Sequence, residues 1–191
     1  MEQFFDNYWK SLDGAFRQLD REAFSKILGI FQEAYREDRQ IFCIGNGGSA
    51  ATANHFVCDF GKNAVQDPGR RRFRMISLSD NVEKITAFGN DVAFDEIFRQ
   101  QLINLMDEGD VLLAISASGN SPDLLKACQY AREKKGRIIT VSGYEGGRIR
   151  GYAEAALTAG LKSYEQIEDI HMILMHMIVC WFKMNPESLT A

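Results

Sequence analysis

Apolar residues recur with a helical period at the start of the chain and follow a different pattern after it. Within residues 1–37 they recur every three or four positions, first as Phe4, Phe5, Tyr8, Leu12 and Phe16 and then as Phe24, Ile27, Leu28, Phe31 and Tyr35. Such spacing places these side chains on one face of a helix. The pattern therefore predicts two amphipathic helices before residue 38.

Short apolar runs replace this period from residue 38 onward. The candidate strands are 41–45, 73–78, 111–116 and 137–142, with 153–158 as a weaker one. Helical patterns lie between or after them, at about 49–62, 95–107, 122–135 and 164–184. Strands that alternate with helices are typical of a parallel sheet covered by helices on both faces. The sequence thus predicts an α/β fold, a three-layer sandwich like that of flavodoxin or Rossmann proteins, with two leading helices.

Length and composition fit one structural domain. The chain has 191 residues, of which 46% are hydrophobic and 25% are charged, as in ordinary globular proteins. We interpret residues 1–37 as helices that pack in an oligomer and residues 38–191 as the main domain. The net charge of −4 gives no general attraction to nucleic acid or to membranes, so neither is an expected partner.

The expected location of the protein is the cytoplasm. The N-terminal residues lack the basic and apolar regions of a signal peptide, and the apolar stretch from Ile170 to Phe182 is too short to span a bilayer. None of the four cysteines forms a C-x-x-C pair, which is typical of a protein with free thiols in a reducing compartment.

Two loops rich in glycine and serine follow strands of the predicted sheet. "GNGGS" (45–49) follows the first strand and "SASGNS" (116–121) follows the third. Glycine lets backbone N–H groups approach an anion closely, and each loop leads into the positive end of a helix. Ligands of open parallel sheets bind where such strand ends meet. We therefore expect both loops to face one crevice that holds a small phosphorylated molecule.

Other phosphate sites fit these loops less well. Neither loop has the lysine of a P-loop, so hydrolysis of nucleoside triphosphates is not expected. Gly45, Gly47 and Ala50 match the G-x-G-x-x-A dinucleotide fingerprint, but the acid at the end of the following strand, Asp80, comes later than that site requires. A dinucleotide site stays open as an alternative, as does a tight glycine turn that binds no ligand.

Candidate metal ligands begin with one of the three histidines of the chain. His55 and Asp59 are four residues apart, so they share one face of the predicted helix after the first loop. Imidazole nitrogen and carboxylate oxygen suit Zn²⁺ or a similar divalent ion. An exposed histidine–aspartate pair without an ion is the plain alternative. Cys58 points off this face and is expected to be a buried thiol rather than a ligand.

The last predicted helix adds Glu168 and His176. The eight residues between them correspond to about 12 Å along a helix axis, which is too far for both to bind one ion from a straight helix. We therefore hypothesise that some ligands come from a neighbouring subunit. Asp169 is a rival to Glu168, because Asp169 shares a face with His176. His171 lies about 140° around the helix from His176, and we interpret it as a packed histidine.

Four blocks of the sequence resemble one known family. They are "GNGGSA" (45–50), "GND" (89–91), "GDVLLAISASGNS" (109–121) and "QIEDIHMILMH" (166–176). In this order, and over nearly the whole chain, they resemble the sugar isomerase (SIS) domain family and within it the phosphoheptose isomerases. The resemblance implies a five-stranded parallel sheet flanked by helices and a homotetramer. It also implies a zinc-dependent conversion of sedoheptulose 7-phosphate to an aldoheptose 7-phosphate.

The resemblance also implies which residues act. The implied substrate contacts are Asn46, Gly47, Gly48, Ser49, Asp59, Asn90, Asp91, Ser116, Ala117, Ser118, Ser121 and Glu168. The implied metal ligands are His55, Asp59, Glu168 and His176. The chain departs from the family pattern at two of these positions, where Asp59 replaces a glutamate and Glu168 replaces a glutamine. Both replacements keep oxygen donors, and both bear on which sugar and which metal the site accepts.

Aldose–ketose exchange moves a proton between adjacent carbons through an enediol. Carboxylate and imidazole are suitable acid/base groups, and a divalent ion stabilises the enediolate. We expect Asp59 to be the carbon base and His176 its acid/base partner, with the reverse assignment open. The competing hypotheses are a non-catalytic protein of the same fold, which binds a phosphosugar or a bacterial replication initiator, and a sugar-phosphate sensor. The set His55, Asp59, Glu168 and His176 favours the enzyme, because a pure binding protein does not need it.

Overall fold

The structure is a computed structural model, and it describes residues 1–190. Within these residues five parallel strands form one sheet in the order β2-β1-β3-β4-β5. The strands are β1 (Gln40–Ile44), β2 (Arg74–Ser77), β3 (Val111–Ser116), β4 (Arg137–Gly143) and β5 (Ala155–Ala159). The predicted α/β fold with five parallel strands is confirmed.

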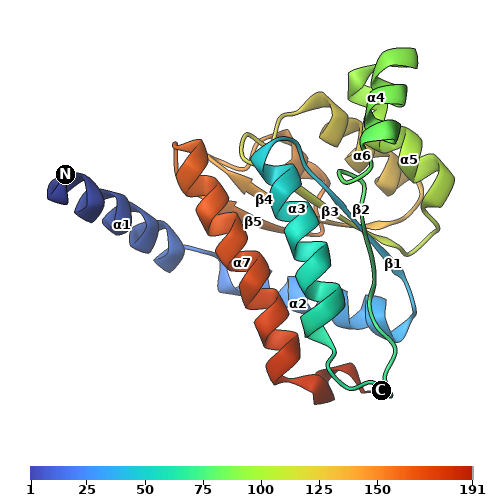
Figure 1. Cartoon of the computed structure of the whole chain (residues 1–191), viewed down its shortest axis with the longest axis horizontal. Helices are drawn as coiled ribbons and strands as arrows, with labels where there is room; N and C mark the ends of the chain where they lie inside the picture. The colour runs from blue at the N-terminus through green and yellow to red at the C-terminus, as the bar shows by residue number, and fades with distance from the viewer. Residues whose placement is uncertain (191) are drawn as a thin grey trace.

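Helices cover both faces of the sheet, as Figure 1 shows. On one face lie α2 (Arg21–Arg36), α3 (Gly48–Asp59) and α7 (Tyr164–Met184), and their apolar side chains share one core with the strands. On the other face lie α5 (Ile97–Leu105) and α6 (Pro122–Glu133), which build a second core. The sheet with a helical layer on each side is the predicted three-layer sandwich.

The sequence pattern did not predict α4 (Val82–Asp91), which packs beside α5. This helix is only ten residues long and none of its residues is buried, although Ile85 and Phe88 pack partly against the second core. Its start is set locally, because the side chain of Asn81 accepts a hydrogen bond from the backbone N–H of Lys84.

The burial of the strands explains their sequences, and the order of the strands shows where a ligand crevice is expected. All six residues of β3 are buried, so this central strand is a continuous apolar run, whereas the edge strand β5 alternates. The chain leaves β1 for β2 on one side and then crosses to β3 on the other side of β1. This reversal between β1 and β3 is the point where open α/β sheets bind ligands.

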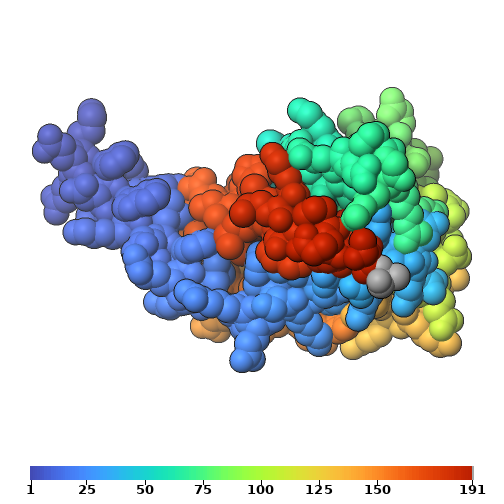
Figure 2. Space-filling view, turned by 90° about the horizontal axis from the view of Figure 1, so that it is seen from below, coloured from blue at the N-terminus to red at the C-terminus, as the bar shows by residue number. Residues whose placement is uncertain are grey.

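The two predicted N-terminal helices differ in their packing. The α2 helix is part of the core, whereas α1 (Glu2–Arg17) projects from one end of the molecule (Figures 1 and 2). The α1 side chains of Phe4, Phe5 and Trp9 are 73%, 72% and 65% exposed. In the described part of the chain, no helix combines the length and apolar character required to cross a membrane.

Candidate active site

The loops after β1 and β3 meet at the reversal point of the sheet. The side-chain amide of Asn46, in the first loop, donates a hydrogen bond of 2.7 Å to Asp123, in the first turn of α6. A cleft of about 490 Å³ lies beside this bond and is lined by Asn46, Ser121, Asp123 and residues 93–95, among others. The prediction that the two loops face one crevice is therefore confirmed.

The serine loop is shaped by its own hydroxyl groups. The Oγ atoms of Ser116 and Ser118 accept hydrogen bonds from the backbone N–H groups of Gly119 and Asn120, at 3.0 and 3.2 Å. Gly119 has φ +65°, and a side chain there would collide with the carbonyl of Gly146. Ser121 is the N-cap of α6 and makes no side-chain capping bond, so its hydroxyl remains available to an anion beside the positive end of the helix.

Ala117 and Ser49 have packing positions within these two loops. Ala117 is 5% exposed, and its carbonyl accepts a hydrogen bond of 2.9 Å from Gly143, which attaches the serine loop to β4. Ser49 is 3% exposed in the first turn of α3. Both predicted contact residues therefore shape the loops from within.

The glycine loop ends against a carboxylate from the last helix. Gly47 has φ +54° and is the N-cap of α3, which has no side-chain cap. A methyl group on Gly48 would overlap the carboxylate of Glu168. Burial raises the pKa of Glu168 above its usual value, and the negative charges of Glu165 and Asp169 raise it further. Glu168 thus lies at the positive end of α3, beside the glycine loop.

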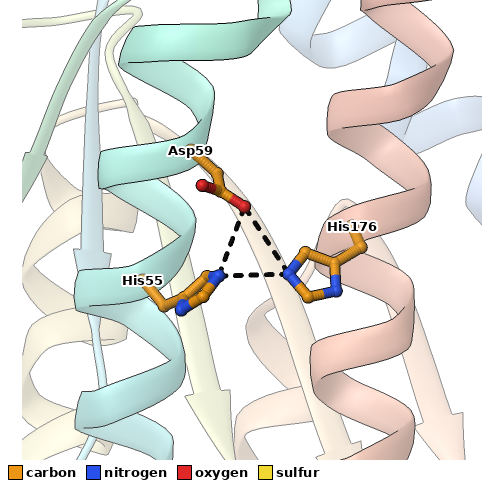
Figure 3. Close-up of side chains that lie close together, drawn as sticks. All are labelled: His55, Asp59 and His176. Carbon is orange, nitrogen blue, oxygen red and sulfur yellow. Dashed lines mark hydrogen bonds and ion pairs between the residues drawn. The ribbon is translucent and has the colours of Figure 1, made fainter.

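Three predicted ligands converge between α3 and α7, as Figure 3 shows. The Nε2 atoms of His55 and His176 are 3.1 Å apart, and Asp59 Oδ2 lies 3.2 Å from the first and 3.5 Å from the second. The side chains of His55, Asp59 and His176 are 49%, 27% and 47% exposed. They form an open cluster on the outer surface of the helix layer.

The donor atoms of this cluster are close enough to one another to hold a metal ion. Tetrahedral zinc with bonds of about 2.0 to 2.1 Å requires donor atoms about 3.3 Å apart. The three spacings of 3.1, 3.2 and 3.5 Å bracket that value. Three protein ligands with one open position are typical of catalytic zinc, whereas structural zinc is closed by four.

Glu168, the fourth predicted ligand, lies apart from the other three. The α7 helix is continuous from Tyr164 to Met184, so Glu168 is about 12 Å along its axis from His176. The estimate of that distance from sequence was correct. The hypothesis that a neighbouring subunit must therefore supply metal ligands was not required for this cluster, because α3 of the same chain contributes His55 and Asp59.

Other predicted residues fall into different surroundings. Asn90 and Asp91 are exposed at the end of α4, where the amide of Asn90 donates to Asp91 at 2.8 Å. His171 is fully buried, which confirms its interpretation as a packed histidine. The prediction for Cys58 was wrong, because this thiol is exposed on the outer side of α3.

The sequence did not predict that Asp123 belongs to the crevice. An acidic residue in the first turn of a helix is usually an exposed residue that interacts with the helix dipole, and the sequence offers no sign that this one is buried. Only the packing of α6 against the first loop reveals that Asp123 faces Asn46.

The profile of the SIS domain family matches residues 3–143 of the chain. The chain belongs to the SIS domain family. The phosphoheptose isomerase of Pelobacter propionicus is 40% identical to it over 149 residues, which cover 78% of this chain and 77% of that protein. The phosphoheptose isomerase of Geobacter sulfurreducens is 37% identical over 166 residues, with 85% and 86% covered.

A solved structure of phosphoheptose isomerase from Neisseria gonorrhoeae superimposes on this SIS domain chain with a TM-score of 0.86, at 26% identity and with 96% of both chains covered. The SIS domain chain is therefore of the phosphoheptose isomerase type, as its sequence motifs indicated. It is an enzyme of the isomerase class that acts on a sugar phosphate.

Proposed function

We propose that this enzyme converts sedoheptulose 7-phosphate to D-glycero-D-heptose 7-phosphate by metal-assisted proton transfer. The observation that carries the proposal is the convergence of His55, Asp59 and His176 from two helices of one chain. A protein that only binds or senses a phosphosugar has no need of this set. The similarity to two phosphoheptose isomerases at 40% and 37% identity supports the choice of substrate.

His55, Asp59 and His176 would hold the ion, which we propose to be Zn²⁺, because two imidazoles and a carboxylate at these spacings suit it. When bound, the ion would stabilise negative charge on the oxygens of the enediolate.

Asp59 and His176 each keep one atom free for proton transfer. The Oδ2 atom of Asp59 and the Nε2 atom of His176 face the cluster, which leaves Oδ1 and Nδ1. In the proposed reaction, Asp59 takes a proton from C1 of the ketose and returns it to C2. His176 gives a proton to the oxygen on C2 and takes one from the hydroxyl on C1. The product is the aldose, with no atom gained or lost.

The crevice would bind the rest of the substrate. We assign the phosphate to the serine loop, through Ser116, Ser118, Ser121 and the N-terminus of α6. The sugar hydroxyls are assigned to Asn46, Gly47, Gly48, Asn90, Asp91 and Glu168, and Ser49 is assigned a place beside the phosphate. Ala117 shapes the phosphate loop through its backbone.

We further propose that the enzyme is a homotetramer with its sites at subunit interfaces. His55 lies seven residues after Gly48 in α3, which is about 10 Å along the helix axis. The metal cluster and the crevice of one chain are therefore separated along this axis. A site that stabilises an enediolate should exclude water, whereas the cluster of a single chain is open to it. The exposed aromatic residues of α1 supply an apolar surface for a neighbouring chain.

The activity is tested by NMR of the purified protein with sedoheptulose 7-phosphate in D₂O. We expect an aldose that carries deuterium at C2, lost on chelation and restored by zinc. Asp59→Asn should abolish turnover, whereas Asp67→Asn, on an exposed turn, should not. No turnover in the presence of zinc would reject the proposal and leave a binding protein with an isomerase fold.

The subunit arrangement is tested by mixing two inactive variants. His176→Ala disables the cluster and Ser118→Ala weakens the phosphate loop. If each site combines the cluster of one subunit with the loop of its neighbour, mixed tetramers regain activity that neither variant has alone. Mixed tetramers with no recovery would place each site within one chain, and light scattering would confirm the tetramer itself.

A further inference from the structure

Asp123 joins the two loops of the crevice, and nothing in the sequence pattern gives it a function. It is the second residue of α6 and is 2% exposed. Its Oδ2 atom accepts the hydrogen bond of 2.7 Å from Asn46 Nδ2, across 77 positions of sequence. Asn46 is one of the residues assigned to the sugar hydroxyls, so Asp123, which lines the same cleft, contacts a substrate-binding side chain.

The chemistry of this pair fixes which end of the Asn46 amide faces the crevice. An asparagine side chain carries an NH₂ donor on one side and a carbonyl acceptor on the other. An ionised carboxylate can only accept, so it must face the NH₂ group. The amide oxygen of Asn46 then points away from Asp123. Without a carboxylate there, either end of the amide could face the ligand.

Hydrogen bonds oppose the effect of burial on the Asp123 carboxylate. Burial, the largest effect, raises the pKa of Asp123, as does the negative charge of Asp95, and hydrogen bonds from Asn46 and from the backbone N–H groups of Asp123 and Leu124 limit this rise. The N-terminus of α6 contributes further positive potential. A charged acceptor strengthens the bond to the Asn46 amide and gives it a single orientation.

We propose that Asp123 is a positioning residue that orients the Asn46 amide, so that Asn46 presents a hydrogen-bond acceptor to a hydroxyl of the substrate. The inference rests on the proposed sugar-phosphate site. It adds a selectivity: a sugar with a free hydroxyl at this position is accepted, whereas an analogue without that hydroxyl, or with a methyl ether in its place, loses the bond.

The test compares Asp123→Asn with a matched buried carboxylate. Asp110 is 5% exposed and accepts hydrogen bonds from the backbone N–H groups of Gln40 and Asp107, at the opposite end of β3 from the crevice. We expect Asp123→Asn to raise the KM for sedoheptulose 7-phosphate about tenfold, as expected for one misdirected hydrogen bond, with kcat changed less. Asp110→Asn should lower the melting temperature and leave KM unchanged.

A double-mutant cycle separates positioning from a general structural effect. Asn46→Ala removes the oriented amide, so Asp123→Asn should not raise KM further in that background. If Asp123→Asn alone leaves KM unchanged, or raises it equally with and without Asn46, the proposal is overturned. Asp123→Ser, which also suits the first turn of a helix, replaces Asp123→Asn in the cycle if that variant does not fold.

A measurement without substrate keeps this inference distinct from the proposed function. The ¹⁵N side-chain amide signal of Asn46 should move on Asp123→Asn and stay in place on Asp110→Asn. If the wild-type protein converts no sugar, the proposed function fails, but this signal still decides whether Asp123 orients Asn46. An Asn46 signal that is unaffected by Asp123→Asn contradicts the proposal.

Discussion

The two faces of α7 carry the same residue type in opposite surroundings. His171 is fully buried, and burial lowers its pKa to about 4. His176, five residues later, is 47% exposed at its side chain and lies 3.1 Å from His55. The helical period alone separates the two environments, so the inner face of α7 contributes to stability and the outer face to chemistry.

The largest expected effect comes from removing His176 from the outer face of α7. His176→Ala removes one donor of the metal cluster and the proposed proton carrier, so kcat should fall by about 10³-fold or more. The side chain of His176 is half exposed, so the free energy of unfolding should change by less than about 0.5 kcal/mol. Steady-state rates and chemical denaturation check both parts. A variant that keeps a tenth of the activity would show that His176 is not essential to the reaction.

The inner face of α7 should instead make the stability of the protein depend on pH. An ordinary histidine has a pKa near 6.5, and that of His171 is lowered to about 4 by burial, with a smaller opposing contribution from the Ser142 backbone. Between those values the unfolded chain binds a proton and the folded chain does not, so stability is complete above about pH 6.5 and is lost as the pH falls towards 4. The maximum loss is about 3 kcal/mol.

His171→Leu isolates this contribution. The variant removes the titrating group and keeps a side chain of similar size, so its advantage over the wild type should grow by about 2 kcal/mol between pH 7 and pH 5. Denaturant unfolding at several pH values measures the difference. If the difference between the two proteins does not change with pH, the buried imidazole does not govern acid stability.

A smaller effect is expected where α7 meets the start of α3. Gly48→Ala places a methyl group against the carboxylate of Glu168, which is the flexible end of a long side chain and can move aside. Alanine also favours the helix by up to about 1 kcal/mol, so stability should hold or rise slightly. Activity should fall about tenfold, because the displaced carboxylate sits in the proposed substrate crevice.

Gly29→Ala is the matched control for this variant, since nothing lies within 4 Å of a side chain added there and Gly29 is in the middle of α2. It should gain stability with unchanged activity. A Gly48→Ala protein that behaves in the same way would exclude Glu168 from the reaction.

The sequence predicted those parts of the molecule that depend on local periodicity. The bounds of α7 agree with the predicted 164–184, and β3 was recognisable because a strand buried on both faces is an uninterrupted apolar run. The helix α4 was not predicted, because it is only ten residues long and none of its residues is buried. The neighbouring 95–107 helix was found, because Ile97, Phe98 and Leu102 are buried.

The site was less predictable, because it depends on how helices pack against one another. The spacing of His55 and Asp59 showed that they share a face, but only the packing of α3 beside α7 brings His176 to them. The spacing within α7 alone suggested that a ligand comes from another subunit, which the cluster of His55, Asp59 and His176 does not require. The outward direction of Cys58 and the burial of Asp123 are also results of packing, which no local pattern reveals.

The smallest expected effect tests whether the contact between α1 and α7 influences the reaction at the outer face of α7. The hydroxyl of Tyr8 donates a hydrogen bond of 2.6 Å to Asp169, and this bond, with burial, raises the pKa of Tyr8 to about 12. Water competes at this exposed position, so Tyr8→Phe should cost less than about 1 kcal/mol and leave kcat unchanged. Tyr164→Phe is the control, because Tyr164 is also exposed and no hydrogen bond of its hydroxyl is found within residues 1–190. A fall in kcat with Tyr8→Phe but not with Tyr164→Phe would mean that the orientation of α1 reaches the metal cluster two turns further along α7, and the chemical face of this helix would then begin at Asp169.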